Sequence, residues 1–198
     1  YRVFAFDAPG HGLSPDAATN LIDVGYAVQS VIEQHGPFES IIAHSFGAAA
    51  TTIMLAREPQ LAPRKLILLS PMRDLQQQID VFSDVARLSS VCKTRLETEI
   101  TRRVGLPLEM CSTIQSVRSL NVSGLVIHDH DDRLIPYSVG VRVAQHWHKA
   151  LLISTDRLGH QLALRNAEVI GQIVDFLEPT PLYEDLFTLV RTKDGLAY

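Results

Sequence analysis

The sequence predicts an α/β fold in which helices cover both faces of a mostly parallel sheet of at least five strands. Two observations point to this class. Short apolar runs alternate with stretches of helical periodicity, a pattern typical of parallel strands joined by right-handed crossovers. The runs are also continuously apolar, as expected of strands buried on both faces. With 198 residues, 46% of them hydrophobic and 20% charged, the chain is long enough for a sizeable core.

Five apolar runs account for the predicted strands. They cover residues 3–6, 41–43, 65–70, 124–128 and 151–153. The first run begins almost at Tyr1 with no residues leading into it, and Tyr1 is not a methionine. We therefore expect that the native protein has further residues upstream.

Helices are predicted between these strands. The first begins after Asn20, a good N-cap, and ends at Gly36 and Pro37. Further helices are expected over 46–57, from Ser138 to about Trp147, and up to Leu177.

The alternation stops between residues 72 and 120. Apolar residues there fall at helical spacing in three groups, near 79–88, 96–104 and 110–120. We expect a core made of residues 1–71 and 121–178, a helical insertion over 72–120, and a C-terminal tail over 179–198.

Composition excludes several classes of function. The net charge is −4 and no long basic run occurs, which argues against binding to nucleic acid or to an anionic membrane. No apolar stretch approaches the roughly 20 residues that span a bilayer. Two cysteines, Cys92 and Cys111, are too few for a disulfide scaffold and favour free thiols in a cytoplasmic protein.

Ser45 stands where the strand 41–43 meets the helix 46–57. A serine at such a junction is held on a sharp turn, with its hydroxyl at the carboxyl end of the sheet. The turn is crowded, so small residues are expected around it, and Ala43 and Gly47 flank Ser45 at two residues' distance. The alternative is a serine that merely caps a helix.

A serine hydroxyl needs a base to remove its proton, and the base needs an acid to orient it. His160 follows the strand 151–153, and Asp129, Asp131 and Asp132 follow the strand 124–128. Because the carboxyl ends of parallel strands lie at one edge of a sheet, these residues and Ser45 are expected to meet there.

Several motifs resemble those of the α/β-hydrolase superfamily. The stretch around Ser45 is similar to the nucleophile elbow G-x-S-x-G, with Ala43 in place of the first glycine. The segment from Asp7 to Ser14 resembles the D-x-P-G-x-G-x-S loop that precedes the elbow in many members.

The loop after the strand 124–128 resembles the family pattern H-G-x-x-D-x-x-x-P. His128 and Pro136 match its ends, which implies that Asp132 is the acid, while Asp129 replaces the usual glycine. A strand ending in His-Asp and a histidine loop reading Leu-Gly-His, as at His160, are similar to one bacterial group whose substrates are mostly unassigned.

The resemblance implies an α/β-hydrolase fold, a cap formed by residues 72–120, and a serine mechanism. Ser45 would be the nucleophile, His160 the general base and then acid, Asp132 the orienting carboxylate, and the Phe46 backbone N–H an oxyanion donor. A second interpretation of 72–120 is extra crossover helices with no role in binding.

The family's second oxyanion donor comes from a loop that would precede Tyr1. In the family's sheet the strand before that loop lies between the strands 3–6 and 41–43. Its absence predicts a gap or a rearranged pairing, and leaves the first-strand edge open to pairing with a second copy of the chain.

The predicted function is hydrolysis of an ester or related acyl bond in a small molecule, carboxylesterase-like (EC 3.1), through an acyl-enzyme and without a cofactor or metal. The same triad can cleave thioesters or carbon–carbon bonds. One alternative is a non-catalytic binding or regulatory protein, or an incomplete fragment, on a hydrolase scaffold. Another is a metal-dependent hydrolase using His128, His130 and Asp132, although Arg133 would place a cation beside the metal.

Overall fold

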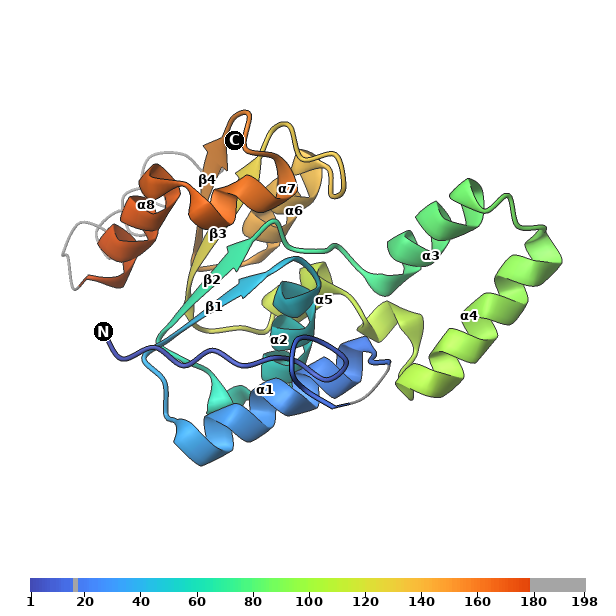
Figure 1. The fold of residues 1–198 in the computed structure, drawn as a ribbon, viewed down its shortest axis with the longest axis horizontal. Helices are drawn as coiled ribbons and strands as arrows, with labels where there is room; N and C mark the ends of the chain where they lie inside the picture. Colours follow the sequence, from blue (N-terminus) through green and yellow to red (C-terminus); the bar gives the residue numbers. More distant parts are fainter. Residues whose placement is uncertain (16–17, 179–198) are drawn as a thin grey trace.

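The computed structural model describes residues 1–15 and 18–178, so the predicted tail lies outside the described residues. Its sheet has four parallel strands in the order β1-β2-β3-β4 (Figure 1). They are β1 (Ser40–His44), β2 (Lys65–Leu69), β3 (Ser123–Asp129) and β4 (Ala150–Thr155). In this register His44 pairs with Leu69 and Leu69 with Ile127, so the carboxyl ends of the strands lie along one edge.

The predicted strand at residues 3–6 is wrong, and the described sheet has four strands rather than at least five. A strand needs a neighbour for its backbone N–H and C=O groups, and within the described residues β1 pairs with β2 alone. Phe4 instead stacks on the His35 ring at a centroid distance of 5.2 Å and meets the Phe38 ring edge to face at 5.3 Å. No other strand of residues 1–15 and 18–178 pairs with the outer edge of β1, and Ile42 on that strand is 52% exposed. Pairing of this edge with a second copy stays a prediction.

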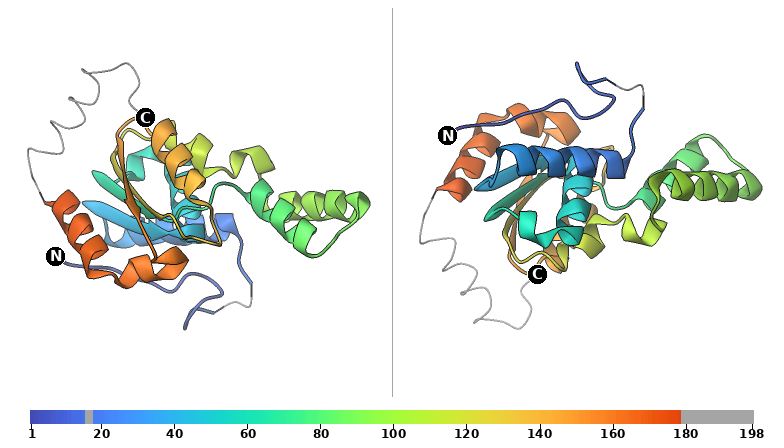
Figure 2. Two further views of the ribbon diagram at one scale, coloured as in Figure 1. Left: turned by 90° about the horizontal axis from the view of Figure 1, so that it is seen from above. Right: turned by 90° about the horizontal axis from the view of Figure 1, so that it is seen from below.

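Helices cover both faces of the sheet, as predicted (Figure 2). One face carries α1 (Leu21–His35), α2 (Ser45–Arg57), α5 (Thr113–Val117) and α6 (Tyr137–His146), whose apolar side chains form the larger buried cluster. The other face carries α8 (Ala167–Leu177), where Val169, Ile173 and Phe176 pack on Ile67 and Leu125. Shorter elements are η1 (Pro59–Leu61), η2 (Leu108–Met110), α7 (Gly159–Leu162) and η3 (Ala163–Arg165). None of the helices described is both long enough and apolar enough to cross a membrane.

The ends of α1 confirm the predicted signals. The Asn20 side chain accepts hydrogen bonds from the N–H groups of Ile22 and Asp23, at 2.8 and 3.1 Å, and so caps the helix. Gly36 ends it, its N–H donating to the Ile32 carbonyl at 2.8 Å.

Helices α3 (Leu75–Val85) and α4 (Ser90–Val104) form a hairpin that projects away from the sheet (Figures 1 and 2). Several of its apolar side chains are exposed, with Val85 at 80% and Phe82 at 56%, while Ile79 and Val104 are buried. In contrast, Ile114 and Val117 of α5 are buried in the core. The first two helices of the predicted insertion therefore project, and the third packs against the body of the fold.

The two chain segments at the root of the hairpin are hydrogen-bonded to each other. We call this root, residues 72–75 and 111–113, the neck. The Thr113 N–H donates to the Arg73 carbonyl at 2.9 Å, and the Leu75 N–H donates to the Cys111 carbonyl at 3.0 Å. The neck also meets the elbow, because the Met72 N–H donates to the Ser45 carbonyl at 3.3 Å.

Candidate active site

Ser45 directly follows β1 and is the first residue of α2. Its φ is +53°, in the left-handed region that L-residues rarely adopt, as expected of a sharp strand-to-helix turn. Ala48, Ala49 and Ala50 are buried and let α2 pack closely on the sheet. At Gly47, however, an added Cβ would meet nothing within 4 Å among the described residues, so the crowding expected there is not seen.

Three of the predicted site residues lie together at the carboxyl edge of the sheet. The His160 Nε2 atom is 2.9 Å from the Ser45 Oγ atom, and the His160 Nδ1 atom is 2.7 Å from the Asp132 Oδ2 atom. The His160 side chain is only 10% exposed. These distances allow a nucleophile, a base and an orienting carboxylate to act in sequence.

Asp132 is held by two backbone groups as well as by His160. Its Oδ1 atom accepts hydrogen bonds from the N–H groups of Leu134 and Ile135, each at 2.9 Å. Burial alone would raise the pKa of the Asp132 carboxyl, but the hydrogen bonds from Ile135, His160 and Leu134 together lower it. Asp132 is therefore a buried carboxylate that stays charged at neutral pH.

His44 is hydrogen-bonded to the segment after β4 that carries His160. Its Nε2 atom lies 2.9 Å from the His160 carbonyl oxygen, and the two imidazole rings are 4.7 Å apart. Burial lowers the pKa of His44, so the ring is neutral and its Nε2–H donates to that carbonyl. His44 is thus a hydrogen-bonded residue that joins the end of β1 to the segment carrying His160.

Asp129 has a structural position that the sequence analysis did not foresee. The sequence presents it as one of three candidate acids, but its carboxylate accepts from four donors away from His160: Asp131 N–H, Thr155 Oγ1–H, Leu158 N–H and Gly159 N–H. The one signal in the sequence is an aspartate where the family pattern has glycine. Asp131 is exposed and accepts from the Arg157 N–H at 2.9 Å.

The residues considered as metal ligands do not converge. The buried His128 directs its Nε2 atom to the Ile135 carbonyl oxygen at 2.9 Å. The exposed His130 instead lies against the Tyr137 ring, with the two rings tilted and their centroids 3.9 Å apart. Over residues 1–15 and 18–178 no group of three His, Cys, Asp or Glu side chains could hold a metal ion.

Comparison with known families identifies the family of this chain. A family model described as "Alpha/beta hydrolase family" matches residues 1–172, nearly the whole described chain. The chain belongs to the alpha/beta hydrolase family. A search among curated proteins returned no match.

Solved structures resemble this alpha/beta hydrolase in fold. A thermophilic esterase is 21% identical, with a TM-score of 0.59 over 86% of this chain and 78% of that one. A monoacylglycerol lipase from Paleococcus ferrophilus is 16% identical, with a TM-score of 0.65 over 87% of this chain and 81% of that one. A putative non-heme bromoperoxidase from Mycobacterium tuberculosis H37Rv is also 16% identical, with a TM-score of 0.64 over 87% and 79%. At these identities the likeness establishes the fold and leaves the substrate open.

The predicted oxyanion donor, the Phe46 N–H, lies in the first turn of α2. N–H groups in a first turn have no partner within the helix, and α2 has no side-chain cap. The helix dipole also favours negative charge at this end. The Met72 N–H, which approaches from the neck, already donates to the Ser45 carbonyl.

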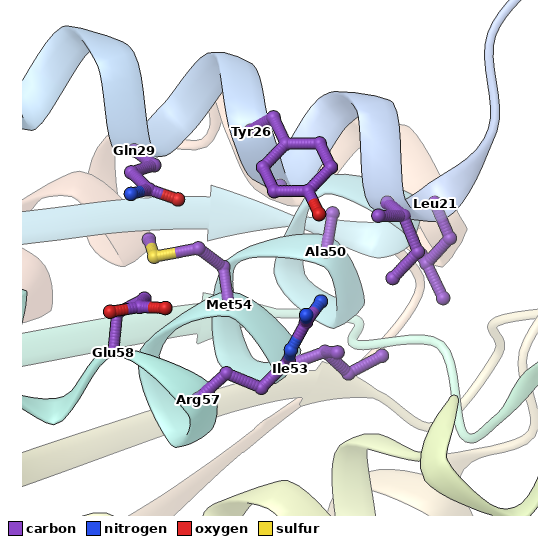
Figure 3. Close-up of a pocket in the computed structure, with 10 residues that line it drawn as sticks. Leu21, Tyr26, Gln29, Ala50, Ile53, Met54, Arg57 and Glu58 are labelled. Carbon is purple, nitrogen blue, oxygen red and sulfur yellow. The ribbon is translucent and has the colours of Figure 1, made fainter. Parts of the chain in front are cut away.

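A wide depression of about 490 Å³ borders His160 in this alpha/beta hydrolase. It is lined by Asp131, Arg133, Leu134 and residues 157–160; His160 borders it, whereas Ser45 and Asp132 do not. A second cavity lies between α1 and α2, among Leu21, Tyr26 and Met54 (Figure 3). That cavity measures only about 20 Å³, room for about one water molecule, and none of Ser45, Asp132 and His160 lines it.

Proposed function

We propose that this alpha/beta hydrolase cleaves an ester or related acyl bond in a small molecule through an acyl-enzyme formed on Ser45. The observation that carries the proposal is the hydrogen-bonded series from Ser45 to His160 to Asp132, with distances of 2.9 and 2.7 Å. The three side chains come from three separate loops, so local sequence does not account for their meeting.

The tautomer of His160 follows from its partners. Asp132 is a carboxylate and can only accept, so the Nδ1 atom carries the proton and the Nε2 atom is the acceptor for the Ser45 hydroxyl. The His160 ring is thereby oriented to act as a general base.

The reaction then runs in two halves. The Ser45 Oγ atom bonds to the substrate carbonyl carbon while its proton passes to the His160 Nε2 atom. The leaving alcohol takes that proton as its bond to the acyl carbon breaks. Water repeats the sequence on the acyl-enzyme, releasing the acid and restoring the Ser45 hydroxyl. Asp132 stays charged and stabilises the imidazolium, and the Phe46 N–H donates to the carbonyl oxygen as it becomes negative.

The role of the predicted cap is assigned here to the hairpin α3–α4. The hairpin leaves the core at the neck, next to Ser45, and carries exposed apolar side chains such as Phe82 and Val85.

A fluorophosphonate probe tests the nucleophile. We expect covalent labelling of Ser45, located by peptide mass spectrometry, with Ser45→Ala unlabelled and the exposed-serine variant Ser154→Ala labelled like the unmodified chain. A panel of p-nitrophenyl esters of increasing chain length then defines the acyl preference. A folded protein in which Ser45 is not labelled would instead support the non-catalytic binding protein.

A further inference from the structure

Two segments matter here: the acid loop, which follows β3 and carries Asp132, and the histidine loop, which follows β4 and carries His160. We propose that Asp129 is a positioning residue that holds these two loops in a fixed relation. This inference rests on the function proposed above. Asp129 does not touch Ser45 or the reacting atoms. It acts through Asp132 and His160, which lie on the two loops that its carboxylate joins.

The Asp129 carboxylate has hydrogen-bond partners on both sides of the site. The Oδ1 atom accepts from the Asp131 N–H on the acid loop and from the Gly159 N–H on the histidine loop, each at 2.9 Å. The Oδ2 atom accepts from the Thr155 hydroxyl at 2.7 Å and from the Leu158 N–H at 3.1 Å. A single buried side chain therefore ties the residues next to Asp132 to the residues next to His160.

The histidine loop is shaped to present its N–H groups to carboxylates. Arg157 and Gly159 have left-handed backbones, with φ of +61° and +60°, while Leu158 between them is right-handed. Alternation of this kind turns successive N–H groups to one side and makes a concave anion-binding backbone. Here the concavity is occupied from within, because Asp129 takes two of the three N–H groups and Asp131 takes the third. An arginine in the left-handed region is unfavourable by itself, so these bonds help to maintain the turn.

The site requires a charged carboxylate. Burial alone would raise the pKa of Asp129, but the hydrogen bonds from the Thr155 hydroxyl and from the backbone N–H groups of Gly159, Asp131 and Leu158 lower it. An ionised carboxylate can accept from all four donors. A glycine at this position would accept none, and an asparagine would turn its own N–H₂ group towards a donor.

The test compares two Asp→Asn variants, one at Asp129 and one on the histidine loop. Asp129→Asn is expected to lower kcat by about 10- to 100-fold with little change in KM, because small displacements of catalytic groups cost rate rather than binding. The rate of fluorophosphonate labelling at Ser45 is expected to fall by a similar factor. Asp156→Asn is the matched control: Asp156 is an exposed residue of the histidine loop, and the variant is expected to keep the rate of the unmodified chain.

A direct readout comes from NMR. The proton on His160 Nδ1, which is hydrogen-bonded to Asp132, should give a low-field signal. In Asp129→Asn this signal is expected to be weaker, or the proton to exchange faster with water. In Asp156→Asn it is expected to be unchanged. A purely structural role would lower the melting temperature of Asp129→Asn but leave kcat and this proton unchanged in the cold, where the variant is folded. That result would overturn the proposal.

Two further outcomes can be distinguished: failure of Asp129→Asn to fold, and failure of the proposed function. If Asp129→Asn does not fold, Thr155→Val removes one donor and keeps the carboxylate; a several-fold loss of kcat supports the proposal, and an unchanged kcat contradicts it. If the unmodified chain neither hydrolyses esters nor reacts with the probe, the proposed function fails. The His160 proton, compared between Asp129→Asn and the unmodified chain, then still decides whether Asp129 positions the two loops.

Discussion

Asp132→Asn is expected to remove almost all activity because it reverses the tautomer of His160. The introduced amide would keep its oxygen where Oδ1 now accepts from the Leu134 and Ile135 N–H groups, which puts its N–H₂ group opposite the His160 Nδ1 atom. The Nδ1 atom must then accept, so the ring proton moves to Nε2. A protonated Nε2 facing the Ser45 Oγ atom cannot take the hydroxyl proton.

The size of the effect follows from related chemistry. The same substitution in a chymotrypsin-type triad lowers kcat by about 10⁴, equivalent to about 5 kcal/mol of transition-state stabilisation. Side-chain volume hardly changes and both backbone N–H groups keep an acceptor, so the fold should be retained.

The assay is the steady-state hydrolysis of a short p-nitrophenyl ester, with circular dichroism to verify folding. Asp131→Asn is the comparison variant; Asp131 is exposed and lies one residue away, so a far smaller loss is expected. Asp129→Asn is also expected to be much milder than Asp132→Asn. Retention of more than about a tenth of the activity in Asp132→Asn, or a more severe loss in Asp129→Asn, would refute the tautomer argument.

Three other predictions follow from the same site. Ser45→Ala should abolish hydrolysis with the melting temperature changed by only a few degrees, since the one side-chain bond lost is that to His160; activity near that of the unmodified chain would rule out Ser45 as nucleophile. Prolonged EDTA treatment should leave the rate unchanged; a loss that zinc restores would favour a metal mechanism on His128, His130 and Asp132. Burial lowers the pKa of His128 below its usual value of about 6.5, so the unfolded chain binds more protons as the pH falls below that value and the melting temperature should drop. His128→Gln should show a shallower drop by differential scanning fluorimetry between about pH 7 and 5, and an equal drop would contradict this account.

Most of the fold could be predicted because its signals are local. The apolar runs marked all four strands that form, and Asn20 and Gly36 marked the ends of α1. Residues 3–6 carry the same local signal as the other runs, yet a strand also depends on a neighbour, which the residues themselves do not encode. The helix expected over 110–120 is split into η2 and α5 because the backbone at Cys111 and Ser112 pairs with Asp74 and Leu75 across the neck.

In the candidate site, the meeting of the three site residues was predictable, but the hydrogen bonds of Asp129 were not. Chain order and strand ends were enough to expect Ser45, His160 and one of three aspartates at one edge of the sheet. The choice of Asp132 among the three came from the resemblance to the family pattern. The bonds of Asp129 could not be expected, because they depend on a left-handed backbone at Arg157. Arginine has no preference for that conformation, so Gly159 could indicate its own left-handed backbone but nothing indicated the one at Arg157.

The neck allows the projecting hairpin to be replaced by other sequences during evolution. Because the hydrogen bonds among Arg73, Leu75, Cys111 and Thr113 already hold the two ends of the hairpin together, the chain between them can change in length at little entropic cost. Insertions, deletions or a wholly different pair of helices could be accepted there without moving a strand of the sheet. With the roles proposed above, selection could alter what is bound separately from how the bond is broken, since the hairpin and the three site residues are encoded by different stretches of sequence.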